Sequence, residues 1–168
     1  QCNLLDIIVP SSVNLVEDYA FDEANSLTKI ELPDSITNIG SYAFSGCGNL
    51  VDVKLSNNIT SILSSTFQFC ESLTDITIPV GVTSIEGSAF NGCYNLKNVF
   101  IPNGINSIGQ GAFRNCTSLD RISIPSSVTS LDPEAFINCK NLANIYYDGN
   151  KEDWLMIEYT AEHTSEDG

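Results

Sequence analysis

The feature that most constrains this chain is a repeat with a period of 23. Phenylalanine recurs once in every period, and a leucine follows each phenylalanine six positions later. The phenylalanine column holds Phe21, Phe44, Phe67, Phe90, Phe113 and Phe136, and the leucine column holds Leu27, Leu50, Leu73, Leu96, Leu119 and Leu142. A register kept through six units does not arise by chance. It predicts a solenoid in which each unit forms one coil, and stacked coils bury what a single coil cannot.

Each unit contains a short strand. In the unit that begins at Leu96, Val99 and Ile101 alternate with polar or outward positions, which is the period of a β-strand, and Pro102 then ends the strand because it has no N–H to donate. Equivalent strands are expected at residues 4–9, 27–32, 50–55, 73–78, 96–101, 119–124 and 142–147. We expect one parallel sheet of these seven strands, about 29 Å wide at ~4.8 Å per neighbour.

The remainder of each unit predicts the opposite side of the coil. Ile105 and Ile108 should turn inward, and the segment 111–116 resembles one helical turn with Ala112 and Phe113 buried. The predicted fold is therefore an α/β solenoid, a right-handed coil with short helical turns opposite the sheet. Ser56 and Thr66 make the third unit the most divergent, and we expect local loosening there.

The repeat ends near residue 147, so the sequence divides into an array at 1–147 and a C-terminal cap with a polar, loosely ordered tail at 148–168. Asn150 is expected to cap a short helix that carries Trp154 and Ile157 on one face. This helix would cover the end of the core, as repeat arrays require. The alternative is that Trp154 belongs to a ligand pocket.

The N-terminal end carries no such cap in the sequence. Leu5, Ile7, Ile8 and Val9 would form an open apolar edge strand, which natural proteins usually avoid. We expect either that the chain is a piece of a longer one or that a partner covers this edge. In the isolated chain we expect an artefact in which the edge strands of two molecules pair with each other.

The formal charge of −14 is concentrated at the ends, with −6 over residues 1–34 and −6 over residues 148–168. This charge argues against nucleic acid as a partner, since a phosphate-binding face needs clustered Lys and Arg. Like-charged ends favour solubility and discourage end-to-end stacking. A diffuse cation site is the alternative, but no calcium-loop spacing is present. No apolar stretch approaches the ~18 residues of a membrane span, so no membrane insertion is expected.

Five of the six cysteines share one repeat position, at Cys47, Cys70, Cys93, Cys116 and Cys139. Side chains stacked in parallel point alongside one another, so disulfides are not expected, and without a C-x-x-C pair zinc is not expected either. We interpret the five as buried free thiols and expect Cys2, which is out of register, to be exposed. The single histidine, His163, lies in the tail, and no nucleophile–base pair or phosphate loop is found. The sequence predicts no enzyme, no cofactor and no metal.

If the repeated residues build the core, recognition should use the residues that break the columns. On the outward strand positions these are Phe100 and Tyr146, flanked by Asp75, Asn98 and Arg121. An exposed aromatic residue beside an arginine is typical of interface hot spots. Phe69 and Tyr94 break their own columns at the edge of the predicted helical turns and are second candidates. The alternative is that these aromatics are isolated and exposed without a role.

The unit 119–131 with its following segment 134–139 resembles the BspA-like leucine-rich repeats, and the resemblance covers residues 4–147. It implies a secreted or cell-surface bacterial protein that adheres to host proteins, such as extracellular matrix, or to bacterial surface proteins. It carries over no defined binding residues. The alternatives are a structural spacer and a targeting arm of a larger surface protein or enzyme.

Overall fold

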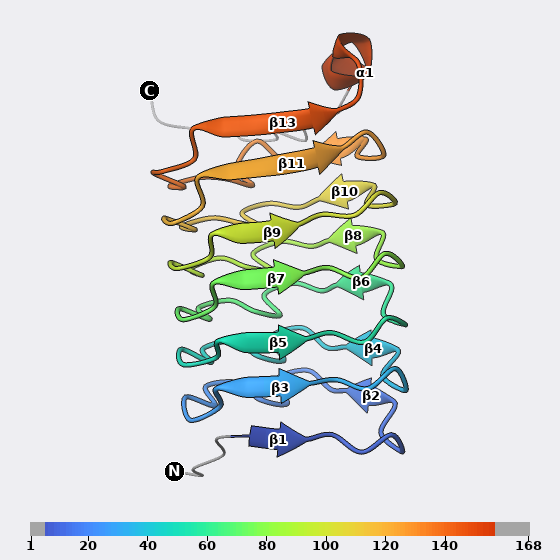
Figure 1. Ribbon diagram of the computed structural model, residues 1–168, viewed down its shortest axis with the longest axis vertical. Helices are drawn as coiled ribbons and strands as arrows, with labels where there is room; N and C mark the ends of the chain where they lie inside the picture. Colours follow the sequence, from blue (N-terminus) through green and yellow to red (C-terminus); the bar gives the residue numbers. More distant parts are fainter. Residues whose placement is uncertain (1–5, 157–168) are drawn as a thin grey trace, which may run out of the picture.

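The computed structural model describes residues 6–156, which form a solenoid with two rows of short parallel strands (Figure 1). The first row contains β1 (Asp6–Ile8), β3 (Lys29–Glu31), β5 (Asp52–Lys54), β7 (Asp75–Thr77), β9 (Asn98–Phe100), β11 (Arg121–Pro125) and β13 (Asn144–Asp148). The second row contains β2 (Leu15–Val16), β4 (Asn38–Ile39), β6 (Ser61–Ile62), β8 (Ser84–Ile85), β10 (Ser107–Ile108) and β12 (Ser130–Leu131). A third, turn-rich side leads from each second-row strand to the next first-row strand, and we refer to it as the turn side.

The prediction of seven parallel strands at these positions is confirmed. Where two strands of the first row are hydrogen-bonded, each residue pairs with the residue one repeat period later, as Asp6 does with Lys29. The prediction of one continuous sheet is wrong. The first row divides into three hydrogen-bonded groups, β1-β3-β5, β7-β9 and β11-β13, although β5 and β7 remain neighbours, as do β9 and β11. The second row, which the sequence did not predict as strands, divides into β2-β4 and β6-β8-β10-β12.

The predicted helical turns are also wrong, because the turn side uses a different hydrogen-bond pattern. The amides of Phe44 and Gly46 donate to carbonyls of the next coil, at 2.9 and 2.7 Å, whereas the alternate amides of Ser45 and Cys47 donate three residues back within their own coil. An α-helix needs every amide to bond four residues back in the same segment. Left-handed backbone at Tyr42 (φ 59°) and Gly46 (φ 69°) reverses the chain direction between successive turns.

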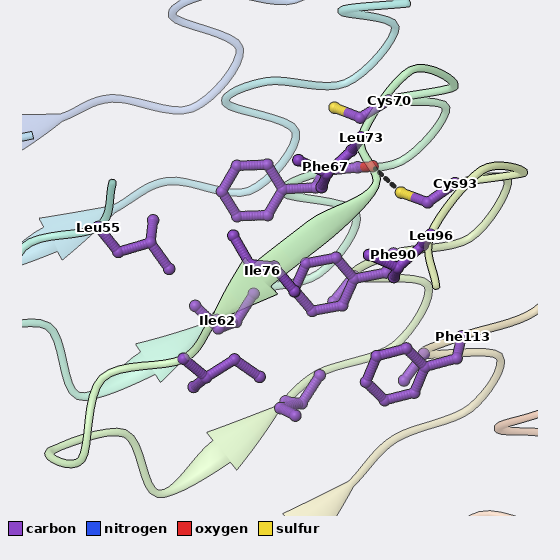
Figure 2. Packing of buried hydrophobic residues seen from close by; sticks show 14 of the residues in the cluster. Leu55, Ile62, Phe67, Cys70, Leu73, Ile76, Phe90, Cys93, Leu96 and Phe113 are labelled. Atoms are coloured by element: carbon purple, nitrogen blue, oxygen red, sulfur yellow. Dashed lines mark hydrogen bonds between the residues drawn. The ribbon is translucent and has the colours of Figure 1, made fainter. Parts of the chain in front are cut away.

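Inside the coils, equivalent side chains form continuous stacks (Figure 2). The six phenylalanine rings from Phe21 to Phe136 stack with centroids 5.1–5.6 Å apart and planes within 8° of parallel. Leucines and isoleucines from the strands fill the rest, and Ile105 and Ile108 are buried as predicted. The phenylalanine and leucine stacks continue through the array, and the coil at 50–72 differs from the others in burying the polar side chains Ser56, Ser65 and Thr66.

The described cysteines are free and follow the same stacking. Each Sγ lies 3.0–3.3 Å from the carbonyl oxygen of the phenylalanine 26 residues earlier, to which its S–H donates, and Figure 2 shows this for Cys93 and Phe67. Buried thiols were predicted, but this donor role was not. Cys139, near the C-terminal end of the array, is only partly buried, and Cys2 lies outside the described residues.

At the C-terminal end, α1 (Lys151–Met156) begins after Asn150, whose Oδ1 accepts a hydrogen bond from the amide of Asp153 at 2.8 Å. The indole of Trp154 packs against the ring of Tyr147 with centroids 5.2 Å apart. Ile145 nevertheless remains 46% exposed. The described residues end before Ile157, His163 and the predicted tail. The C-terminal cap and the division of the chain between residues 147 and 148 therefore remain predictions.

Candidate functional site

The outward positions of the first row differ along the array. On β3 and β5 they carry a network of opposite charges. Lys29 Nζ lies 2.9 Å from Asp52 Oδ2 and 3.3 Å from Glu31 Oε1, and Lys54 Nζ lies 3.9 Å from Glu31 Oε2. Hydrogen bonds to Asp52 and Glu31 raise the pKa of Lys29 above its usual 10.5. In this part of the face the charges are already paired with one another.

On β7 to β13 the outward positions carry the residues that the sequence singled out. Phe100 is 60% exposed and Tyr146 is 57% exposed. The strand register places Thr77 beside Phe100 and Ser123 beside Tyr146. Phe100 and Tyr146 therefore project from the same column two strands apart, roughly 10 Å, with the small Ser123 between them. The predicted exposure of both aromatic residues is confirmed.

The second outward column of this part is polar. Asp75 lies beside Asn98, whose Nδ2 donates to Asp75 Oδ1 at 2.6 Å, and the Thr74 hydroxyl donates to Asp75 Oδ2 at 2.7 Å. The hydrogen bonds from Thr74 and then from Asn98 lower the pKa of the Asp75 carboxyl below its usual 3.8. Arg121 has a 69% exposed side chain and makes only a long contact of 3.8 Å with Asp120. Its guanidinium therefore has donors available to a partner.

We name the five residues Asp75, Asn98, Phe100, Arg121 and Tyr146 the aromatic face. Hollows of about 690 and 310 Å³ lie beside the first and last strands of the row, and neither is lined by Phe100 or Arg121. The aromatic face thus offers projecting rings on a strand surface, not a cavity around a small molecule.

Phe69 and Tyr94 lie elsewhere, on the turn side. Phe69 has left-handed backbone (φ 57°), and its ring lies over Gly92, where an added Cβ would come within 2.4 Å of Phe69 Cδ1. Tyr94 follows two residues after Gly92, and its amide donates to the Gly92 carbonyl. Phe69 is 40% exposed and Tyr94 is 38% exposed. Both residues therefore lie near Gly92 on the turn side and do not extend the aromatic face.

Another aromatic pair, of which Tyr19 is exposed and Tyr42 is partly buried, was missed in the sequence. The rings of Tyr19 and Tyr42 stack on the turn side with centroids 4.9 Å apart, and Tyr19 is 56% exposed. Their separation by one full period of the repeat was the available signal. Val80, at a corner after β7, is 77% exposed and was also missed.

Metal binding and thiol chemistry each require particular side-chain arrangements, which can be compared with residues 6–156. No three His, Cys, Asp or Glu side chains there are grouped so that they could hold a metal ion. Burial raises the thiol pKa of Cys47 to about 11 and that of Cys93 to about 12, which disfavours the nucleophilic thiolate. No helix among these residues has the length and apolar character that crossing a membrane requires.

Comparison with known families gives a match over residues 1–102 and 64–154 to the BspA-type leucine-rich repeat region, with six copies of the repeat. No curated protein sequence matches the chain. Among solved structures, a leucine-rich cell-surface protein of Faecalibacterium prausnitzii A2-165 is 35% identical with a TM-score of 0.62. The match covers 91% of this chain, which spans only 34% of that protein.

Two further structures are similar. The leucine-rich repeat protein of T. pallidum is 32% identical with a TM-score of 0.82, over 84% of this chain and 69% of that one. A leucine-rich repeat protein of Eubacterium ventriosum is 26% identical with a TM-score of 0.73, over 85% of this chain and 37% of that one. The likeness therefore includes sequence as well as coil geometry.

Proposed function

The chain belongs to the BspA-type leucine-rich repeat family, and on that premise we propose that it is a non-catalytic module that binds a protein through the aromatic face. The partner we propose is a protein at the bacterial exterior, either a host extracellular-matrix protein or a bacterial surface protein, so that the module serves adhesion. The similar F. prausnitzii protein is a leucine-rich cell-surface protein, which supports a secreted or surface location for this chain.

The observation that carries the proposal is the exposure of Phe100 and Tyr146 beside Arg121 on a regular strand surface. Aromatic and arginine side chains dominate binding energy at interfaces because they bury a large area and keep specific polar contacts. Strand positions also hold these side chains more rigidly than loops do, which reduces the entropy lost on binding.

The charged part of the face on β3 and β5 is a poorer candidate. Lys29, Glu31, Asp52 and Lys54 already satisfy one another within the chain. A partner that used them would have to displace these contacts and desolvate both signs of charge. We therefore propose that the aromatic face supplies the binding affinity and that the charged part only helps to orient the partner.

The size of the surface limits the affinity. A first row of seven strands, ~29 Å wide and with side chains reaching across ~20 Å, offers about 600 Å², below the ~800 Å² per partner of a standard interface. The aromatic face is only part of that row. Binding by this segment should be weak, and a longer array of coils would bind more tightly through added area.

The test is a binding screen of the whole chain against immobilised host extracellular-matrix proteins and against cells of related gut bacteria. With a captured partner in hand, Phe100→Ala combined with Tyr146→Ala should weaken binding at least tenfold, as expected for hot-spot residues. Lys29→Ala combined with Lys54→Ala is the matched control on the same row and should change affinity less than threefold. The proposal would be contradicted if the control variant lost binding while the variant with Phe100→Ala and Tyr146→Ala kept it.

A further inference from the structure

Ladders of backbone hydrogen bonds join neighbouring coils along most of the array. In the second row, the amide of Thr83 donates to Thr60 at 2.9 Å, and that of Gly109 donates to Ile85 at 2.8 Å. In the first row, β3 pairs with β5 and β7 pairs with β9 in full register. A coil bonded on two sides to both neighbours cannot tilt without breaking several bonds.

The coil at 50–72 is the exception, because both rows are interrupted there. In the second row β4 and β6 are not bonded, and in the first row β5 and β7 are not bonded (Figure 1). The two breaks are staggered. The coil is joined through β5 to the coil before it and through β6 to the coil after it.

The turn side remains continuous across both breaks. The amide of Phe44 donates to Thr66 at 2.9 Å, and the amide of Phe67 donates to Ala89 at 2.8 Å. Phe67 stacks between the rings of Phe44 and Phe90 at 5.3 and 5.5 Å. The coil is thus connected to both neighbours along one side, and on each of the other two sides it is connected to only one neighbour.

Ser56 and Thr66 are side chains that distinguish this coil from the others. In the described residues the buried polar side chains are Ser56, Ser65 and Thr66, all of which belong to this coil. The Ser56 hydroxyl donates to the carbonyl of Ile36 at 2.5 Å. The Thr66 hydroxyl donates to the carbonyl of Leu63 in its own coil at 2.8 Å and also lies 3.4 Å from the carbonyl of Gly40. The carbonyls of Ile36 and Gly40 flank β4, where the ladder to β6 is missing. A ladder here would use the carbonyls of Thr37 and Ile39, the equivalents of Thr60 and Ile62 in the next coil, so the hydroxyls lie next to the ladder positions and do not occupy them.

Ser56 also changes the corner that leads into β6. Elsewhere this position is proline, and its carbonyl accepts an amide three residues on, as at Pro33 with Ile36 and at Pro79 with Val82. Here the amide of Asn58 donates to the Ser56 hydroxyl at 3.1 Å instead. A turn closed by a hydrogen bond to a side chain two residues back has a different geometry from a turn closed by a backbone hydrogen bond. The chain therefore reaches the second row in a different direction.

We propose that the coil at 50–72 is a hinge about which the segments 6–49 and 73–148 bend. The turn side is the axis, and the two staggered breaks are where the coils separate. The break between β9 and β11 is not a second hinge, because both rows are bonded at the interface before it (β7 with β9, β8 with β10) and the first row is bonded again after it (β11 with β13), so no coil there has a broken row on each of its two faces. Bending would change the angle between the charged part of the first row and the aromatic face, so a partner that contacts both would select one angle.

The first test is hydrogen exchange on the whole chain. The amides of Thr60 and Leu63 should exchange at least tenfold faster than their equivalents Thr83 and Glu86, which have ladder acceptors. Ser56→Pro combined with Thr66→Ala restores the residues of the other coils and should remove the difference. Pro79→Ser combined with Ala89→Thr should create fast exchange in the next coil. Equal protection of the two coils in the unaltered chain would overturn the proposal.

Hydrogen exchange measures the local opening of hydrogen bonds. A second experiment is therefore needed to measure bending between the two segments. Spin labels at Glu31→Cys and Phe100→Cys span three coil intervals across the hinge. Labels at Thr77→Cys and Tyr146→Cys span three intervals within the C-terminal segment, in the same outward column. Both pairs are roughly 14 Å apart along the array. With Cys2 and Cys139 replaced by serine, the first pair should show the broader distance distribution in electron paramagnetic resonance. Equal widths would overturn the hinge even where exchange is fast.

Discussion

The first row presents two unlike surfaces on one backbone. On β3 and β5 its outward side chains are charged and paired, and on β9 and β13 they are aromatic, with Arg121 available between them. Beneath both parts lie the same stacks of leucine, isoleucine, phenylalanine and cysteine. Since these stacks continue beneath both parts, they do not require the exterior to differ. The difference between the two surfaces therefore bears on recognition and not on the fold.

The largest expected effect checks that the interiors are equivalent. Phe44 and Phe113 are both fully buried, and each stacks between two other phenylalanines. Replacing either with alanine removes a ring from a close-packed stack and should cost about 3–5 kcal/mol. Denaturant unfolding of the two variants should give losses within about 1 kcal/mol of each other. A much smaller loss in one of them would show that the two parts differ in their cores as well.

Much of this interior could be predicted from the sequence. Leucine at 96 and phenylalanine at 113 repeat at a fixed spacing, and a residue that repeats in a solenoid faces its equivalents in the neighbouring coils. The period of two in the strands predicted which positions face inward and which face outward. It correctly predicted that Phe100 and Tyr146 are exposed. Periodicity decides which way a side chain faces, and these predictions depended on nothing else.

The turn side was mispredicted because the burial pattern of a helical turn can be produced by another backbone. Ala112 and Phe113 are buried as a helix would bury them. Gly111 and Asn115, however, have left-handed backbone, at φ 61° each. Glycine and asparagine tolerate that region better than other residues, so their recurrence was a usable signal. Tyr42 and Phe69 adopt the same conformation without such a preference and could not have been predicted.

The breaks on the two faces of the coil at 50–72 coincide with side chains that depart from the repeat. The sequence marked Ser56 and Thr66 as divergent, and both rows are interrupted at their coil. Where their hydroxyls donate depends on distances to the carbonyls of Ile36 and Gly40, which no pattern contains. The expected loosening of this unit stays a prediction, which the exchange experiment tests.

A smaller effect concerns the charged part of the surface. Glu31→Gln removes both of the glutamate's ion pairs and leaves Lys29 with Asp52 alone. These side chains are about half exposed or more, so we expect a slight loss of melting temperature at low ionic strength. The loss should shrink in ~1 M salt, where the screening length is about 3 Å.

Ser123→Ala is the matched control for that change, since residue 123 occupies the same outward column in the aromatic part. It removes no ion pair, and its small effect should be independent of salt. A salt-dependent change in Ser123→Ala, or none in Glu31→Gln, would contradict the assignment of paired charges to one part of the row alone.

The smallest effect distinguishes how carboxylates are held in the two parts. Lysine holds Asp52, whereas the neutral donors Thr74 and Asn98 hold Asp75 and lower its pKa. A depressed pKa stabilises the fold above the unfolded value near 3.8, and this contribution disappears as the pH falls through the folded value. Thr74→Val should raise the pKa of Asp75 towards 3.8, and Asn98→Ala should raise it less, as measured by carboxyl-carbon NMR titration. Salt should change this shift little, because neutral donors and not opposite charges cause most of it. Asn144→Ala, three strands from Asp75, should leave the shift unchanged. A shift of the Asp75 pKa that disappears in high salt would instead show that charges dominate both parts of the row.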